Sequence, residues 1–306
     1  MSTSTTSKDA QLPSTGTSGR VPVDLPLAVV LWASAFVGIR AALPSYSPWQ
    51  VAALRFGIAS VVLVGFAIAT RMPRPAVRDM PTLLALGGVG VAGYQLTLGL
   101  GEQRVSAGVA AFLVATVPVL TAVLAWFTLR EGLGARGWTG IGVSCVGVVV
   151  IAVSGHDGLA GLRAGVPGVG LVLVAALCEA VFFIGQKPLL TRYSGLQVAT
   201  WSIWSGTLFL LPGLPGALRA LPTAQHAATA SIVYLGVFPG AVAYLAWSRA
   251  LARTAAARVT TALYLMPVGA LLLAWPWLGE VPQPAALVGG ALCLGGVVLT
   301  NSRRAR

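Results

Sequence analysis

Two stretches of this chain carry the same pattern at the same spacing: PVLTAVLAWFTLRE at residues 118–131 and PVGALLLAWPWLGE at residues 267–280. Each stretch opens with Pro-Val, contains Ala-Trp at matching positions and closes with Glu. Further along, Gly147 and Gly296 keep the same offset of 149 residues. Alanine and glycine match easily by chance in such a composition, but Pro, Trp and Glu at one offset indicate an internal repeat. We therefore predict two related halves.

The composition predicts that both halves lie in a membrane. Of 306 residues, 56% are hydrophobic and 9% are charged, and the mean hydropathy is +0.83. A soluble domain has roughly 25% charged residues, and a spanning helix needs ~20 mostly apolar ones. Long runs such as residues 143–153 lack the alternation of a barrel strand. We predict an all-α integral membrane protein.

Apolar runs between charged or Pro/Gly-rich breaks predict ten transmembrane helices, five in each half. The first repeat is expected at residues 25–154 and the second at 167–301, joined by a linker at 155–166. Residues 1–24 are interpreted as a disordered cytoplasmic tail and 302–306 as a basic one. The predicted spans are 25–44, 49–70, 81–100, 106–128, 137–154, 167–186, 196–214, 228–248, 258–278 and 284–301.

The basic residues predict the orientation of these spans. With a cytoplasmic N-terminus, 15 of the 20 Lys and Arg residues lie inside, as the positive-inside rule expects. Outside loops hold Arg104, Arg163 and Arg219, while Arg40 and Arg55 fall within spans. Because the charges are scattered over loops and form no patch, we expect no nucleic-acid partner. Both termini are predicted to be cytoplasmic, with the protein in the inner (plasma) membrane.

Five spans per half make the two repeats enter the membrane in opposite directions. Glu131 lies between Arg130 and Arg136, on the predicted inside, whereas Glu280 has no basic neighbour and falls outside. Inverted repeats are typical of secondary transporters, whose halves exchange inward-open and outward-open shapes.

Further segments give the chain a resemblance to a known family. They are LWASAFVGIR at 31–40, P-x4-ALRF at 48–56, AGVAA-x6-PV at 107–119, LRE at 129–131, YLMPV at 264–268 and LGE at 278–280. With them, the chain resembles the drug/metabolite transporter superfamily, specifically proteins with two EamA-type repeats, over about residues 25–302. The resemblance implies ten helices, cytoplasmic termini, a central cavity between the halves, and export of amino acids, metabolites or drugs, with import in some members. Many members have Trp-Ala where this chain has Cys178-Glu179-Ala180, so no family role is carried over to Glu179.

The predicted function is secondary active transport of a small metabolite, amino acid or drug by alternating access. Proton-coupled efflux is the preferred form, and an importer or exchanger of the same fold is the alternative. No nucleotide-binding motif is visible, so the energy is expected from a gradient. The expected partners are a small-molecule substrate, the lipid bilayer and protons, without a cofactor or metal. Monomer and homodimer both stay open.

Two other function classes fit the sequence less well. An intramembrane enzyme is disfavoured because His156 and His226 lie in outside loops, no H-E-x-x-H motif occurs, and Glu179 is the one acid expected in mid-membrane. A channel would need a repeated ring of filter groups, and the sequence shows none. We predict that the protein is not an enzyme.

Two of the charged residues within spans are candidates for function, because a charge inside the hydrocarbon region costs ~2.5–3.5 kcal/mol on insertion scales. Glu179, near the middle of the sixth span, is the candidate proton-coupling residue; alternatively it is a neutral carboxyl bonded to a neighbouring helix. Arg55 is a candidate substrate-binding cation for a carboxylate or phosphate, or a partner of Glu179. Alternatively, Arg55 snorkels to the headgroups.

Other polar and aromatic residues inside spans are candidates for the lining of a substrate site. Gln95 can donate to a substrate or bridge two helices. The rings of Trp32, Tyr94, Tyr244 and Tyr264 suit amphipathic or aromatic solutes, while helix packing is the alternative for each.

Three prolines are candidates for gating. Pro118, Pro239 and Pro267 interrupt helix hydrogen bonding within spans, which either permits rocking or produces static bends. The matched placement of Pro118 and Pro267 in the two repeats favours a role in alternating access.

Overall fold

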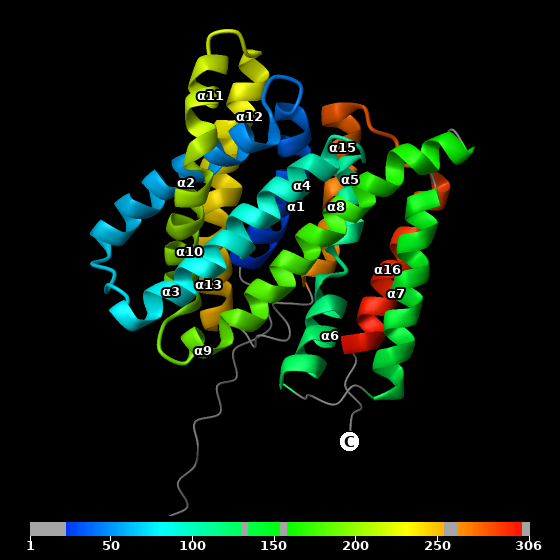
Figure 1. Ribbon diagram of the computed structural model, residues 1–306, viewed down its shortest axis with the longest axis horizontal. Coiled ribbons are helices and arrows are strands. Elements are labelled where there is room, and N and C mark those ends of the chain that lie inside the picture. The colour runs from blue at the N-terminus through cyan, green and yellow to red at the C-terminus, as the bar shows by residue number, and fades with distance from the viewer. Residues whose placement is uncertain (1–22, 130–133, 154–157, 254–261, 302–306) are drawn as a thin grey trace, which may run out of the picture.

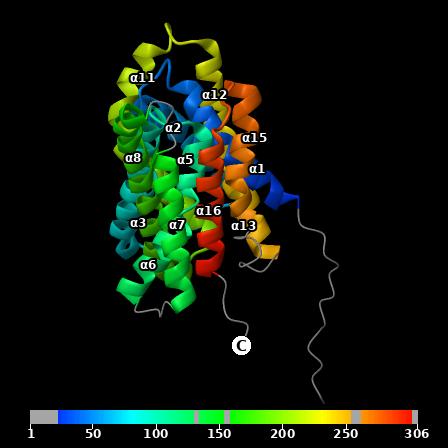
Figure 2. The same cartoon turned by 90° about the vertical axis from the view of Figure 1, so that its right-hand side faces the viewer.

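The computed structural model of the chain describes residues 23–129, 134–153, 158–253 and 262–301. Every regular element within these ranges is helical, as the sequence predicts. Most helices run along a common direction (Figure 2), while α2, α4 and α8 cross the bundle at a slant (Figure 1).

The first half holds helices in all five of its predicted span ranges. In chain order they are α1 (Asp24–Ala42), α2 (Pro48–Ala69), the 3-10 helix η1 (Val77–Asp79), α3 (Met80–Leu86), the π-helix η2 (Gly87–Gly93), α4 (Tyr94–Glu102), α5 (Ala107–Val114), α6 (Val117–Leu129) and α7 (Ala135–Val153). The third predicted span is thus one continuous rod from η1 to α4, and the fourth is interrupted between α5 and α6.

The second half follows the same plan. Its elements are α8 (Gly158–Gly185), α9 (Lys187–Leu190), α10 (Gly195–Leu210), the 3-10 helix η3 (Leu211–Gly213), α11 (Leu214–Ala220), α12 (His226–Val237), the π-helix η4 (Phe238–Val242), α13 (Ala243–Arg253), the 3-10 helix η5 (Ala262–Leu265), α15 (Met266–Leu278) and α16 (Pro284–Asn301). One boundary differs from expectation, because α8 begins at Gly158, inside the stretch 155–166 predicted as a linker. The helix continues from this stretch through Pro167, the residue at which the predicted sixth span begins.

The described helices are suited to a bilayer. Six helical stretches are long and apolar enough to cross it: Asp24–Ala42, Pro48–Ala69, Val77–Glu102, Ala107–Thr128, Val166–Leu190 and His226–Ala250. Three shorter apolar helices, at Ala135–Ile151, Ala262–Leu278 and Pro284–Leu299, accompany them. Large apolar side chains such as Val61, Phe127 and Leu272 are well exposed, as a lipid-facing surface requires. A total of ten crossings remains a prediction.

The internal repeat is visible in the helix starts. At the beginning of α2, the Ser47 hydroxyl accepts a hydrogen bond from the Gln50 amide nitrogen, and the Gln50 side chain accepts one from the Ser47 amide nitrogen. Ser194 and Gln197 make the same pair of bonds at the beginning of α10. Such a capping box satisfies two amide donors at once. It occurs at the second predicted span of each half.

The contact between α7 and α16 relates the two halves to each other. These helices lie side by side (Figures 1 and 2). A Cβ atom on Gly147 would lie 2.6 Å from the carbonyl oxygen of Gly289, and one on Gly296 would lie 2.5 Å from that of Gly140. Because Gly140 matches Gly289 and Gly147 matches Gly296 in the repeat, exchanging the halves converts one contact into the other. The two contacts are therefore equivalent, as they would be if a twofold rotation axis related the two halves.

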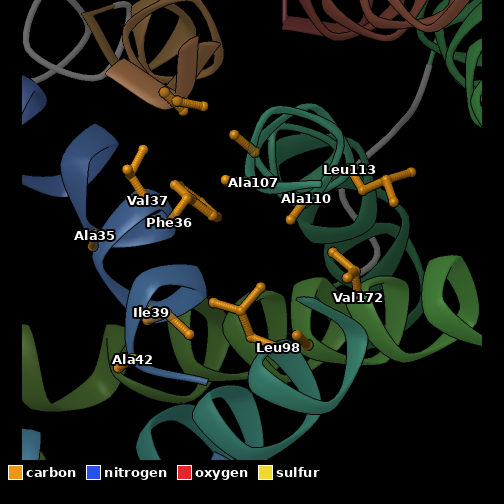
Figure 3. Packing of buried hydrophobic residues seen from close by; sticks show 14 of the residues in the cluster. Ala35, Phe36, Val37, Ile39, Ala42, Leu98, Ala107, Ala110, Leu113 and Val172 are labelled. Atoms are coloured by element: carbon orange, nitrogen blue, oxygen red, sulfur yellow. The ribbon is translucent and has the colours of Figure 1, made fainter. Parts of the chain in front are cut away.

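Helix α1 lies in the middle of the main apolar core. Figure 3 shows Val37 and Ile39 of α1 among Ala110 and Leu113 of α5 and Val172 of α8. On its other sides α1 contacts α12, α13 and α15. Helix α1 therefore belongs to the first half but is packed largely against the second, and this places its polar residues at the junction of the repeats.

Candidate substrate and coupling site

Arg55 is held in the interior by its neighbours on α4 and α12. Its side chain is 5% exposed, and its Nη1 atom donates a hydrogen bond of 2.9 Å to Oε1 of Gln95. Helix α12 approaches so closely that a Cβ atom on Gly236 would lie 2.8 Å from the Arg55 carbonyl oxygen. The snorkelling alternative is therefore wrong, because the guanidinium is turned inward. Among the described residues, no ion pair joins Arg55 to Glu179.

Tyr94 and Tyr244 occupy matching positions in the two halves. Tyr94 directly follows the π-helix η2, and Tyr244 comes two residues after the π-helix η4. A π-helical turn shifts the side chains that follow it and often occurs at functional sites. Both tyrosine hydroxyls are close enough to Arg55 and to Glu179 to interact with them electrostatically. The two irregular segments thus bring matching tyrosines from opposite halves to one place.

Trp32 extends this site along α1. Its ring lies 5.3 Å from that of Tyr244 and 5.1 Å from that of Trp247, measured between ring centroids. Trp247 was not among the residues predicted from the sequence. The available signal was its position three residues after Tyr244 on the same helix, since such a spacing places two side chains on one face.

We define the central polar cluster as Trp32, Arg55, Tyr94, Gln95, Glu179 and Tyr244. Glu179 is half-buried on α8, the helix that packs against α4 and η2. The cluster draws on α1, α2 and α4 of the first half and on α8 and α13 of the second. Tyr264, also predicted as a substrate residue, lies half-buried in η5, which packs on α1. It is not part of the cluster as defined here.

Glu102, which falls between the predicted spans 81–100 and 106–128, is buried in the structure. Glu102 ends α4 and is 0% exposed. Within the described residues, neither of its carboxylate oxygens has a hydrogen-bond partner. Buried acids therefore occur outside the mid-membrane position that the sequence predicts for Glu179, and Asp79 is another. The signal was the spacing of seven residues between Gln95 and Glu102, which puts both on one face of a helix.

An ion pair ties the two halves together at the Glu102 end of α4. The Nε atom of Arg40 lies 3.1 Å from Oε1 of Glu280, and another Arg40 nitrogen donates to the carbonyl of Glu102. The second Glu280 oxygen accepts a 2.9 Å hydrogen bond from the amide of Ala107, the first residue of α5. A carboxylate is stabilised at such a helix N-terminus by the free amides and the helix dipole. We call this group the Arg40–Glu280 tie.

A second tie between the halves lies at the opposite end of the rod from η1 to α4. There Nη2 of Arg192 lies 2.8 Å from one carboxylate oxygen of Asp79. The Tyr193 hydroxyl donates to the other at 2.7 Å and accepts a hydrogen bond from the amide of Ala76. We call this group the Asp79–Arg192 tie. The matching motif residue of Glu280, Glu131, lies outside the described residues.

The three candidate gating prolines all lie where a helix changes. Pro118 is the second residue of α6, just after the interruption that follows α5. Pro267 is the second residue of α15, after the 3-10 turn η5. Pro239 lies within the π-helix η4. Each half thus has an interrupted fourth span with a proline at the start of its second segment.

An apolar groove lies between helices α6, α7 and α8, and none of the residues of the central polar cluster lines it. It has a volume of about 480 Å³ and is lined by α6, α7 and α8, with Leu120, Val149 and Leu177 among its wall residues. Most of its walls are aliphatic, with Thr116, Ser144 and Cys145 among them, and the exposed side chains of Val149 and Val174 lie at its edge. Among the described residues, no three His, Cys, Asp or Glu side chains are grouped so as to hold a metal ion.

Comparison with known proteins agrees with this arrangement. The EamA-like transporter family model matches residues 25–153 and 166–302. The chain belongs to the EamA-like transporter family. Two matches in one chain correspond to the two halves of the structure. Together with the apolar helices, membership shows a multi-pass membrane protein, and it indicates a transporter rather than an enzyme.

Several relatives of the EamA family align along most of the chain. A "Probable terminal-alkyne amino-acid exporter" of Streptantibioticus cattleyicolor is 44% identical over 91% of this chain and 92% of its own length. The "Uncharacterized transporter YdfC" of Bacillus subtilis is 37% identical over 92% and 90%. A "Probable amino-acid metabolite efflux pump" of Escherichia coli is 27% identical over 89% and 92%. A solved crystal structure that is 18% identical superposes with a TM-score of 0.62 over 92% of this chain and 97% of that one, which shows a shared fold.

Proposed function

We propose that this EamA protein exports a small amino acid or a related zwitterionic metabolite by proton-coupled alternating access. The observation that carries the proposal is the convergence of Arg55, Gln95, two matched tyrosines and Glu179 at the junction of the halves. Two aligned relatives bear names that refer to amino-acid export or efflux.

The chemistry of the cluster fits such a solute. The guanidinium of Arg55 presents several donors in one plane, and this geometry suits a carboxylate. Trp32, Tyr94 and Tyr244 offer aromatic surface to an apolar side chain, and each ring also carries a polar group that can hydrogen-bond to the solute. Glu179 carries a carboxyl that can hold either a proton or the substrate ammonium group, and competition between the two is a simple means of coupling.

The two ties give alternating access a physical basis. The Arg40–Glu280 tie and the Asp79–Arg192 tie join the halves at opposite ends of the α3–η2–α4 rod. Opening one side of the molecule would separate one tie and keep the other. In the proposed topology of ten crossings and cytoplasmic termini, Asp79 lies near the cytoplasm and Glu280 near the outside. Pro118, Pro239 and Pro267 then provide the points of bending.

The test is solute uptake into inside-out membrane vesicles with an imposed pH gradient. The probes are L-propargylglycine, which is a terminal-alkyne amino acid, L-norvaline, and propargylamine as an analogue without the carboxylate. We expect gradient-dependent uptake of the two amino acids, little uptake of the amine, and loss of gradient dependence in Glu179→Gln. Uptake in right-side-out vesicles alone would favour an importer. Transport by Glu179→Gln that equals the unmodified protein would remove Glu179 from coupling.

A further inference from the structure

Glu102 is a buried acid that the proposed substrate site does not use. Burial of a charged or polar group without a hydrogen-bond partner is costly, and native proteins rarely leave one so. Within the described residues, both Glu102 carboxylate oxygens lack a partner although the side chain is 0% exposed. A carboxyl in this condition is expected to find its partner in another state of the molecule.

Two arginines lie near Glu102, and each is engaged elsewhere. Arg40 of α1 pairs with Glu280 and donates to the backbone carbonyl of Glu102, not to its carboxylate. Arg55 of α2 donates to Gln95, and its Nε atom has no partner among the described residues. Both arginines are close enough to Glu102 to interact with it electrostatically.

The remaining charges around Glu102 are few. Glu280 reaches it from the segment after α15, and Tyr94 lies on α4 itself. Helix α8 carries Arg163 near its beginning and Cys178 and Glu179 near the central polar cluster, and the exposed Arg104 follows Glu102 on the chain. Neither α5 nor η2 has an ionisable side chain. Gln95 and Glu102 are two helical turns apart on one face of α4, or ~10 Å along its axis. Glu102 therefore lies between the central polar cluster and the Arg40–Glu280 tie.

We propose that Glu102 is a proton-binding site that controls the Arg40–Glu280 tie. With a proton bound, the carboxyl is neutral and leaves Arg40 to Glu280, which keeps this end of the molecule closed. When the proton departs, the carboxylate attracts Arg40, which already donates to the backbone carbonyl of Glu102. Arg40 then leaves Glu280, and the two halves can separate at this end. The proton moves between the carboxyl and water at the opened face, so no other reactant is needed.

Infrared difference spectroscopy of the purified protein in lipid nanodiscs tests proton binding without any substrate. A pH titration of the unmodified protein should show a buried carboxyl stretching band that disappears on deprotonation. We expect Glu102→Gln to lack this band, Glu102→Asp to restore it at a shifted frequency, and Glu179→Gln to retain it. Identical titrations of the unmodified protein and Glu102→Gln would overturn the proposal. Because no solute is added, this result is independent of the proposed export function.

A second measurement tests control of the tie and rests on the proposed function. Counterflow exchange of labelled L-norvaline needs no net proton movement, whereas gradient-driven uptake does. Glu102→Gln mimics the protonated state, so we expect gradient-driven uptake to fall at least tenfold while Glu102→Asp recovers part of it. Exchange should fall together with the uptake, because the tie has to open in each cycle, and exchange at the unmodified rate would contradict control of the tie. Full activity of Glu102→Gln in both assays would exclude a controlling role even if the residue binds a proton.

Discussion

Nη1 of Arg55 lies 2.9 Å from Oε1 of Gln95, which joins α2 to α4 across 40 residues of sequence inside an apolar bundle. The hydrogen bond uses one of the five N–H donors of the guanidinium. The bond orients the guanidinium and leaves its other N–H donors available. A cation oriented in this way is prepared to receive an anionic group from a solute.

Arg55→Ala should therefore weaken the binding of carboxylate-bearing solutes more than the binding of solutes without a carboxylate. A hydrogen bond to a charged group is worth ~1.5–3 kcal/mol, so the apparent affinity for L-norvaline should fall about tenfold to a hundredfold. The amine analogue should change little. The control is Arg104→Ala, which removes a cation from an exposed position. Competition assays in vesicles measure both effects, and an equal loss for the amino acid and the amine would assign Arg55 a structural role.

Much of the fold followed from the sequence, because helix position in a membrane protein depends on long apolar runs. Interior detail was harder to predict. Glu102 stands between Gly101 and Gln103-Arg104, a local composition typical of a loop, so the continuation of α4 was missed. The π-helices before Tyr94 and Tyr244 were missed because an inserted residue leaves the apolar run unchanged. Gly236 packs against the backbone of Arg55 from 181 residues away, and local patterns do not report such a contact.

The close approach of α12 to α2 predicts a specific effect at Gly236. A Cβ atom there would lie 2.6 Å from Cβ of Ile58 and 2.8 Å from the Arg55 carbonyl. We expect Gly236→Ala to cost ~1–3 kcal/mol of stability by overpacking, and to displace Arg55. Gly57→Ala on α2 is the control, since a Cβ atom at Gly57 meets nothing within 4 Å. In detergent, Gly236→Ala should melt at a lower temperature than Gly57→Ala. Equal melting temperatures would contradict the close contact between α12 and α2.

The contact between α7 and α16 predicts different effects of alanine at two adjacent glycines of α16. A Cβ atom on Gly296 would lie 2.5 Å from backbone atoms of Gly140 and Ser144, whereas one on Gly295 meets nothing within 4 Å. Gly296→Ala should lower the melting temperature, and Gly295→Ala should leave it unchanged or raise it through better helix propensity, by up to ~1 kcal/mol. A lower melting temperature for Gly295→Ala than for Gly296→Ala would show that α7 does not contact the Gly296 face of α16.

The inverted arrangement of the halves predicts the sides of two exposed positions. Gly134 follows the segment with Glu131, and Val281 follows Glu280; both are exposed. In a background without native cysteines, Gly134→Cys should react with an impermeant thiol reagent in inside-out vesicles, and Val281→Cys in right-side-out vesicles. Labelling of both positions from the same side would rule out the inverted topology.

The native Cys178 provides a reporter for the two ties, because it is half-buried beside Glu179 and close to the backbone of Gly93. Glu280→Gln weakens the Arg40–Glu280 tie and should speed the labelling of Cys178 from the outside alone. Asp79→Asn weakens the opposite tie and should speed it from the cytoplasmic side alone. A partly exposed ion pair contributes up to ~1 kcal/mol, so a change of about fivefold in rate is expected. Mass spectrometry of a Cys145→Ala background identifies the labelled residue. If either variant opens the site to both sides equally, the ties stabilise the fold without selecting between its two open states, and alternating access must depend on other contacts.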